Sequence, residues 1–270
     1  MRDPYSIYAR YILNLVPLPS LEQEPDAADY GTLIHRILDT FSKRYPAKLD
    51  VPLPDNARAQ LIKIGHQNFQ RFLPHRGAWA FWWPRFLRIA DWFIAQEQLD
   101  RTGISRTWNE VTGTLELDGP NGTFLLTATA DRIDLLKNGN LRIIDYKTGA
   151  IPSTKEVEAG FAPQLPLEAL IAMEGGFTNL PKAGVEVLNY WRLSGSIPPG
   201  QVVNVAKEST QLAEDAKAGL LALIQAFDQG DTPYEARPRP DQAPRFSEYE
   251  HLARLREWAV AGENSGDLEI

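Results

Sequence analysis

The sequence predicts an α/β domain with an N-terminal helical part. Apolar residues recur at helical spacing before residue 110, and alternation with turn signals indicates strands from 111 to 147. Helices and strands then follow one another to residue 228. We expect three parts: a helical part (1–110) with the histidine motif described below, a core (111–230), and a linker with a C-terminal helix (231–270) that packs back on the domain.

Four helices are expected in the N-terminal part: over 4–15, from near Gly31, over 56–72, and from Pro84, which suits a first helical turn. The second carries one apolar stripe at helical spacing, formed by Ile34, Ile37, Leu38 and Phe41. His35 lies beside that stripe. The fourth helix directs Phe86, Ile89, Ala90 and Phe93 inward.

Five of the seven Trp residues lie between residues 79 and 108. The Trp79–Trp83 cluster has two interpretations. It stacks unpaired bases, at roughly 1–3 kcal/mol per base, or it packs in a helical core or a protein interface.

The middle of the chain predicts an antiparallel meander. Strands are expected over 111–117, 123–136 and 141–147. The turn chemistry of 118–122 and the Asn138-Gly139 pair separate them.

Helices and strands alternate after the meander. We expect a helix over 163–173, strands over 185–193 and 202–206, and a helix over 210–228. Residues 229–247 are typical of a linker, and 246–260 of a terminal helix.

Composition limits the function. The 270 residues contain no cysteine, which excludes disulfide scaffolds, thiolate catalysis, Cys-ligated zinc and iron–sulfur clusters. No apolar run reaches the roughly 20 residues that span a bilayer, and the first residues lack a signal-peptide pattern. A cytoplasmic protein is therefore expected.

The net charge is −7, yet residues 36–108 hold twelve Lys and Arg against six Asp and Glu. This basic segment is either an anion-binding face or an ordinary solvated helical surface.

Asp145 and Lys147 end the third strand of the meander. Two residues apart, they share one face, while Tyr146 points to the other. The hairpin returns Asp145 close to Asp131 or Asp134, and neighbouring carboxylates repel each other unless a cation lies between them. Mg²⁺ or Mn²⁺ suits such oxygen ligands and acidifies water, and a nearby lysine orients that water or stabilises charge on phosphorus. The alternative is an Asp–Lys surface pair beside a hairpin.

Four segments in order carry a resemblance. They are Gly31-Thr-Leu-Ile-His35, Ala130-Asp131-Arg-Ile-Asp134, Ile144-Asp145-Tyr-Lys147-Thr-Gly149 and Gln164-Leu-Pro-Leu-Glu168. Together they resemble the PD-(D/E)XK nuclease superfamily, specifically the RecB-like nuclease domain at the C-terminus of AddB-type helicase–nuclease subunits. The resemblance implies a restriction-endonuclease-like core, which is a mixed central sheet flanked by helices.

The resemblance also implies the site residues. The implied metal ligands are His35, Asp131, Asp145 and the backbone carbonyl of Tyr146. The implied catalytic set is Lys147, Asp145, Asp131 and Gln164, with Gln164 supporting the site and the DNA strand.

Several roles stay open. Glu110 is a weaker candidate for an outer carboxylate. Asp134 competes with Asp131, but a spacing of three places them on opposite strand faces, and the family pattern favours Asp131. His35 is alternatively a packing or capping residue, and Gln164 a helix cap.

Members of this family often bind an iron–sulfur cluster through four cysteines. Here Asp3 stands where the first cysteine is expected, so we expect no cluster. Apolar packing should then hold the C-terminal helix to the N-terminal segment, through Phe246, Tyr249, Leu252, Leu255 and Trp258.

The function implied is a Mg²⁺- or Mn²⁺-dependent deoxyribonuclease, an exonuclease in double-strand-break repair and recombination. Its substrate is single-stranded DNA or duplex ends, and its partner is a helicase subunit or domain, because this sequence has no phosphate-binding Gly-rich loop. The rivals are a catalytically silent DNA-binding module of the same fold and an enzyme that acts on RNA or another phosphodiester. Whether the chain is an excised domain or a free-standing relative stays open.

Overall fold

The structure is a computed structural model that describes residues 1–16, 18, 24–49, 51–72, 75–205, 208–239, 241 and 247–254. The chain forms two compact units. Residues 24–228 make the larger unit, and residues 1–23 join residues 229–270 in the smaller one. Within the described ranges, no helix is long and apolar enough to cross a membrane.

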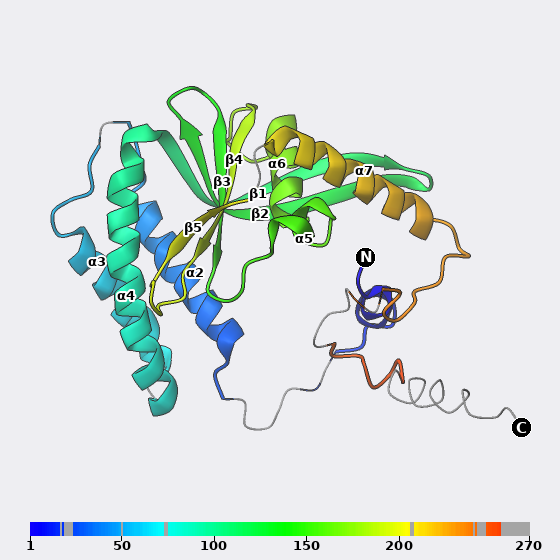
Figure 1. Cartoon of the computed structure of the whole chain (residues 1–270), viewed down its shortest axis with the longest axis horizontal. Coiled ribbons are helices and arrows are strands. Elements are labelled where there is room, and N and C mark those ends of the chain that lie inside the picture. The colour runs from blue at the N-terminus through cyan, green and yellow to red at the C-terminus, as the bar shows by residue number, and fades with distance from the viewer. Residues whose placement is uncertain are drawn as a thin grey trace, which may run out of the picture. The chain divides into compact units, whose positions relative to one another are not determined.

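A five-stranded mixed sheet forms the centre of the larger unit (Figure 1). Its strands are β1 (Ile104–Gly119), β2 (Gly122–Leu136), β3 (Leu141–Lys147), β4 (Val185–Arg192) and β5 (Gln201–Asn204). They lie side by side in sequence order. β1, β2 and β3 pair antiparallel, which confirms the predicted meander. β4 is parallel to β3, and β5 returns antiparallel to β4.

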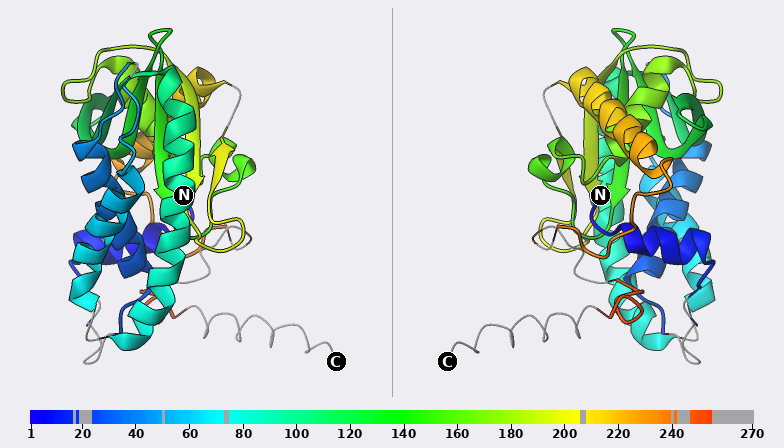
Figure 2. Two further views of the ribbon diagram at one scale, coloured as in Figure 1. Left: turned by 90° about the vertical axis from the view of Figure 1, so that its left-hand side faces the viewer. Right: turned by 90° about the vertical axis from the view of Figure 1, so that its right-hand side faces the viewer.

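Helices cover both faces of this sheet, which confirms the predicted fold class. The helices of the larger unit are α2 (Ala27–Arg44), α3 (Ala57–Phe69), α4 (Arg76–Asp100), α5 (Thr154–Glu158), α6 (Gln164–Glu174) and α7 (Ser209–Phe227). One core joins α2, α3 and α4 to the sheet, and the other joins α6 and α7 to it. Figure 2 shows α4 in front of the strands in one view and α7 in front in the other.

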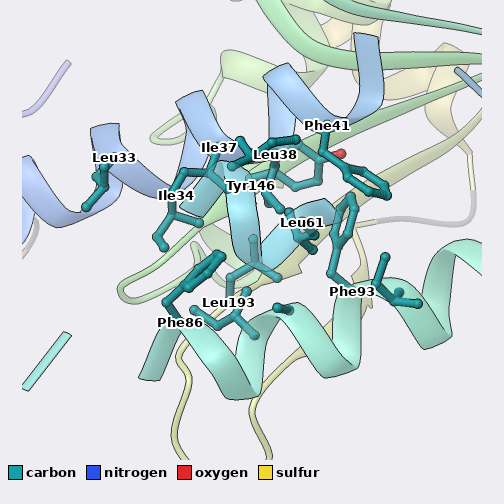
Figure 3. Close-up of a cluster of buried hydrophobic side chains, with 14 of the residues drawn as sticks. Leu33, Ile34, Ile37, Leu38, Phe41, Leu61, Phe86, Phe93, Tyr146 and Leu193 are labelled. Carbon is teal, nitrogen blue, oxygen red and sulfur yellow. The ribbon is translucent and has the colours of Figure 1, made fainter. Parts of the chain in front are cut away.

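Helix α2 begins at a capping box. The Asp26 side chain accepts hydrogen bonds from the backbone of Ala28 and Asp29, and Asp29 accepts one from the Asp26 backbone. The predicted apolar stripe of this helix is fully buried. Figure 3 shows its side chains packed with Phe86 and Phe93 of α4 and with the strand residue Tyr146. Because the stripe packs against both α4 and β3, the orientation of α2 against the sheet is set.

Strand β3 lies between the two cores. Ile143 packs in the core of α6 and α7, whereas Ile144 and Tyr146 pack in the core of α2, α3 and α4. Successive side chains therefore alternate between two apolar interiors. As expected from this alternation, Asp145 and Lys147 share one face of the strand, where Lys147 Nζ lies 2.8 Å from Asp145 Oδ1.

Two element boundaries differ from the prediction. Pro84 lies inside α4, not in its first turn, because Trp82 is buried in the core ahead of it and this packing outweighs the local cost of an internal proline. Trp79 and Trp83 stack on each other at 5.2 Å, beside Phe69. Packing in a helical core is therefore the interpretation that the structure supports for these residues.

Strand β1 begins seven residues before the predicted Val111, at Ile104. Its added residues pair with the last part of β2, and Thr107 donates a 2.6 Å hydrogen bond to Asp134. This partner is distant in sequence, so local alternation did not indicate the strand. The predicted domain boundary at residue 110 falls inside β1.

The smaller unit joins the two ends of the chain. It contains α1 (Pro4–Ile7) and a π-helix, η1 (Tyr8–Ile12). The Tyr5 backbone N–H donates to the carbonyl of Glu235 at 3.2 Å, and the Tyr8 and Tyr234 rings lie 5.5 Å apart.

Polar bonds also join these ends, where we expected apolar packing. Asp3 Oδ2 accepts from Ser247 Oγ at 3.0 Å, and the buried Tyr249 donates from its hydroxyl to the carbonyl of Leu15 at 2.7 Å. Leu252 is 43% exposed. The expectation was thus wrong for Leu252 and incomplete for Tyr249. Phe246, Leu255 and Trp258 lie outside the described residues, as does most of the predicted terminal helix, of which residues 248–254 form turns.

A buried ionic network joins α4 to β2. Arg132 is almost fully buried and contacts the carboxylates of Glu97 and Asp134, which are equally buried. Arg142 reaches Asp134 at 2.8 Å and Asp100 at 2.9 Å. Buried charges that lose their partner are strongly destabilising, so this network fixes the register between helix and sheet.

Arg132→Met should lower the free energy of unfolding by about 3–5 kcal/mol, because it leaves two buried carboxylates without their cation. Chemical denaturation followed by circular dichroism measures the change. Arg58→Ala is the control, since Arg58 and its partner Asp91 are exposed. It should change stability little, and an equal loss in both variants would contradict the proposed importance of the buried network.

Candidate active site

Strand pairing brings two carboxylates together. Arg132 is opposite Ile144 and Ile133 is opposite Ile143, so the register places Asp131 beside Asp145 on neighbouring strands. The backbone N–H of Tyr146 donates to Asp131 Oδ2 at 2.8 Å. The backbone of β3 thereby holds the Asp131 carboxylate at the edge of the paired region.

Helix α2 supplies the histidine. His35 Nδ1 lies 3.2 Å from Asp131 Oδ1. Burial lowers the pKa of His35, but the hydrogen bond to Asp131, the charges of Asp131 and Asp145, and the Tyr146 backbone together raise it. The ring and the two carboxylates therefore form one electrostatic group.

Gly31 allows α2 to approach β3 closely. A Cβ at Gly31 would lie 3.2 Å from the hydroxyl of Thr148, just after the end of β3. Gly31, His35 and Asp39 recur every four residues and share one helical face. This face borders a pocket of about 600 Å³, lined by Gly31, Thr32, His35, Arg36, Asp39, Glu110 and Asp131.

Glu110 enters this pocket through an irregularity in β1. Its φ of 46° is left-handed, a conformation that costs a non-glycine residue energy. Trp108 and Val111, three residues apart, both pack against the core of α6 and α7, so the alternation of side chains breaks at Glu110. The break directs the Glu110 carboxylate to the pocket.

The ligand atoms of His35, Glu110 and Asp131 lie within 4.8 Å of one another. Two carboxylates and an imidazole are a donor set that fits a divalent cation such as Mg²⁺ or Mn²⁺. Burial raises the pKa of Glu110, and the charges of Asp131 and Asp39 raise it further. The part of this shift that comes from the two carboxylates reflects negative charge that a cation in the pocket would relieve.

Asp145 faces a second set of groups. Lys147 Nζ contacts Asp145 Oδ1 at 2.8 Å and Oδ2 at 2.7 Å. The Gln164 side chain donates from Nε2 to Asp145 Oδ1 at 2.7 Å and accepts from Lys147 Nζ at 3.1 Å. Burial raises the pKa of Asp145 to about 6 against the lowering effect of Lys147.

Gln164 begins α6, but its side chain makes no capping bond to the backbone of its helix. It bridges Asp145, Lys147 and Glu168. The structure thus excludes a simple capping role for this residue.

Asp134 lies away from the pocket. It is fully buried and accepts from Thr107, Arg132 and Arg142. The charges of Arg132 and Arg142 outweigh burial and lower the pKa of Asp134. It belongs to the ionic network, so Asp131 is the carboxylate of this segment that meets His35.

Sequence reasoning gave no role to Glu168. It is 2% exposed and accepts a hydrogen bond from Gln164 Nε2 at 3.1 Å. Burial raises the pKa of Glu168 to about 8. Its signal in the sequence is a carboxylate four residues after Gln164, on the same helical face.

The comparison with protein families decides the wider relationship. The family model of the PD-(D/E)XK nuclease superfamily matches residues 2–243. The chain belongs to this superfamily. The resemblance derived from the four sequence segments is therefore confirmed.

Individual relatives of this PD-(D/E)XK chain are longer proteins. An uncharacterized protein of Rickettsia conorii is 35% identical over 180 residues, which are 66% of this chain and 21% of the relative. One of Rickettsia typhi is 31% identical over 210 residues, 76% of this chain and 24% of the relative. A subunit of the ATP-dependent helicase/deoxyribonuclease of Clostridium perfringens, of the AddB type, is 29% identical over 168 residues, 54% of this chain and 14% of the relative. The PD-(D/E)XK chain thus spans a quarter or less of these relatives.

Glu168 gives the metal-free protein a defined pH response. Its pKa in the folded state, about 8, exceeds the ordinary value of 4.5. The stability contributed by the neutral carboxyl is therefore complete below pH 4.5 and is lost as the pH rises through 8. Glu168→Gln should escape this loss, so its Tm relative to wild type should increase from acidic pH to about pH 8 and then level off.

Thermal melts in EDTA across this pH range measure the difference. Glu174→Gln, at the exposed end of α6, is the matched control and should show no such trend. A constant difference between Glu168→Gln and wild type would contradict the raised pKa.

Proposed function

We propose that this PD-(D/E)XK domain is a metal-dependent deoxyribonuclease. The observation that carries the proposal is the meeting of His35, Asp131 and Asp145 with Lys147 at the edge of β3. Clustered carboxylates beside an ammonium group suit phosphodiester hydrolysis, where positioning and electrostatic stabilisation supply most of the catalysis.

His35, Asp131, Asp145 and the backbone carbonyl of Tyr146 would hold Mg²⁺ or Mn²⁺, with Glu110 as a further carboxylate. The closeness of the His35, Glu110 and Asp131 ligand atoms supports this assignment. A cation held there supplies a Lewis acid that acidifies water and offsets the charge of the phosphate.

The remaining groups orient the reactants. The Tyr146 N–H fixes the Asp131 carboxylate, leaving Oδ1 toward His35. Lys147 presents an ammonium group that stabilises charge developing on the phosphate or holds the attacking water. Gln164 keeps hold of the Lys147 ammonium if Asp145 turns toward a cation.

DNA is the proposed substrate, and a helicase subunit or domain the proposed partner. The similarity to part of an ATP-dependent helicase/deoxyribonuclease supports both. We further propose exonuclease action on single strands or duplex ends during double-strand-break repair and recombination. The exposed Arg36, which borders the pocket, is suited to a backbone phosphate.

Asp145→Asn and Lys147→Met should each abolish cleavage of labelled DNA in Mg²⁺ or Mn²⁺, with a loss of at least about 10²-fold for Lys147→Met. Single-stranded DNA, duplex DNA and RNA are compared as substrates, with EDTA as the metal-free reaction. The matched control changes another carboxylate–lysine pair, Glu174→Gln and Lys182→Met, which lies on the surface. Thermal melts check that every variant folds.

The outcomes separate the rival functions. Metal-dependent cutting of DNA that both site variants lose supports the nuclease. Preferred cutting of RNA contradicts the proposed substrate. If wild type binds DNA but cuts no substrate with either metal, and metal does not raise its Tm, the domain is a silent binding module and the proposal fails.

Arg36→Ala combined with Lys43→Ala should weaken DNA binding for all sequences alike, because these exposed α2 residues are placed to meet phosphates. Each lost contact should reduce the slope of log K against log salt by about 0.9 for duplex or 0.7 for single strands. Fluorescence anisotropy at several salt concentrations measures it. Lys182→Ala is the control, and an unchanged slope in the double variant would rule out this face.

A further inference from the structure

The buried carboxylate of Glu168 is unusual because half of it is unsatisfied. Oε1 accepts from Gln164 Nε2 at 3.1 Å, whereas Oε2 is buried with no hydrogen-bond partner in the described part of the chain. Burying a polar atom without a partner costs stability. A stable core therefore gives no reason for a carboxylate at this position.

The Gln164 amide bonds on both sides. Its Nε2 donates to Asp145 Oδ1 and to Glu168 Oε1, and its Oε1 accepts from Lys147 Nζ. Turning the amide over would set its oxygen against two carboxyl groups and its NH₂ against the ammonium of Lys147. Hydrogen-bond chemistry thus permits one orientation.

The geometry of α6 leaves Glu168 little freedom to do anything else. Leu165, Ala169 and Ile171 are fully buried, so the helix cannot turn about its axis without emptying the core. Glu168 lies one turn beyond Gln164 on the same face, within reach of its amide. The helix therefore holds the acceptor at a fixed place beside Gln164.

We propose that Glu168 is a positioning residue, which fixes the orientation of the Gln164 amide and through it the place of the Lys147 ammonium. This inference rests on the proposed nuclease function. Glu168 acts through Gln164 and does not itself contact the substrate.

Glu168→Met keeps the length of the side chain and removes the acceptor, whereas Glu168→Gln keeps an acceptor oxygen. The single-turnover rate of DNA cleavage should fall about 10-fold in Glu168→Met, the effect of one charge-assisted hydrogen bond, and recover largely in Glu168→Gln. DNA affinity in EDTA should not change. The Tm of Glu168→Met should equal or exceed that of wild type, since an unsatisfied buried group is removed.

A double-variant cycle tests the route of the effect. In a Gln164→Ala background, Glu168→Met should cause no further loss of rate, because the amide through which it acts is gone. Glu174→Gln, on the same helix, is the control for general effects on α6. Equal activity of Glu168→Met and wild type, or additive losses in the double variant, would overturn the inference.

A measurement without catalysis keeps this test separate from the nuclease proposal. In ¹⁵N-labelled, metal-free protein, the Gln164 side-chain amide signal is identified by its loss in Gln164→Ala. It should shift and exchange faster with solvent in Glu168→Met. An unchanged signal overturns the inference even if wild type cuts DNA, whereas a wild type that cuts nothing defeats the proposed function instead.

Discussion

The pairing of β2 with β3 is the constraint on which the candidate site depends. It sets Asp131 beside Asp145 and leaves the Tyr146 N–H free to hold the Asp131 carboxylate. β3 cannot shift by one residue, because that would move Ile144 and Tyr146 out of one core and Ile143 out of the other. Apolar packing on both faces of the sheet thus fixes a polar cluster at the end of the strand.

That cluster concentrates charge which a stable fold would avoid. The pKa of Asp145 rises to about 6 and that of Glu168 to about 8, both mainly through burial. Glu110 adds a left-handed backbone. In the ionic network between α4 and β2, by contrast, the buried carboxylates of Glu97 and Asp134 contact arginines. The difference between these two acidic groups supports a role for the first in binding and catalysis.

Most elements of the fold could be predicted from local pattern. The bounds of β3 follow directly from the sequence, and the apolar stripe of α2 is buried as its spacing indicates. The errors fall where distant contacts outweigh local preference. Pro84 is internal to α4 because Trp82 packs ahead of it, and β1 begins early because its first residues pair with the end of β2. The contacts of Asp3 with Ser247 join residues too far apart for any local pattern to indicate them.

For the site, the sequence alone determined which side chains share a strand face, since the two-residue period of a strand requires Asp145 and Lys147 to lie together. With the order of four motifs it also indicated the family. Only the tertiary structure decided which partners those side chains meet. Asp134 was separated from Asp131 by its arginines, Glu110 reached the pocket through an irregular backbone, and Glu168 joined Gln164 inside the protein. These outcomes depend on burial and on contacts between distant segments, and periodicity carries no information about either.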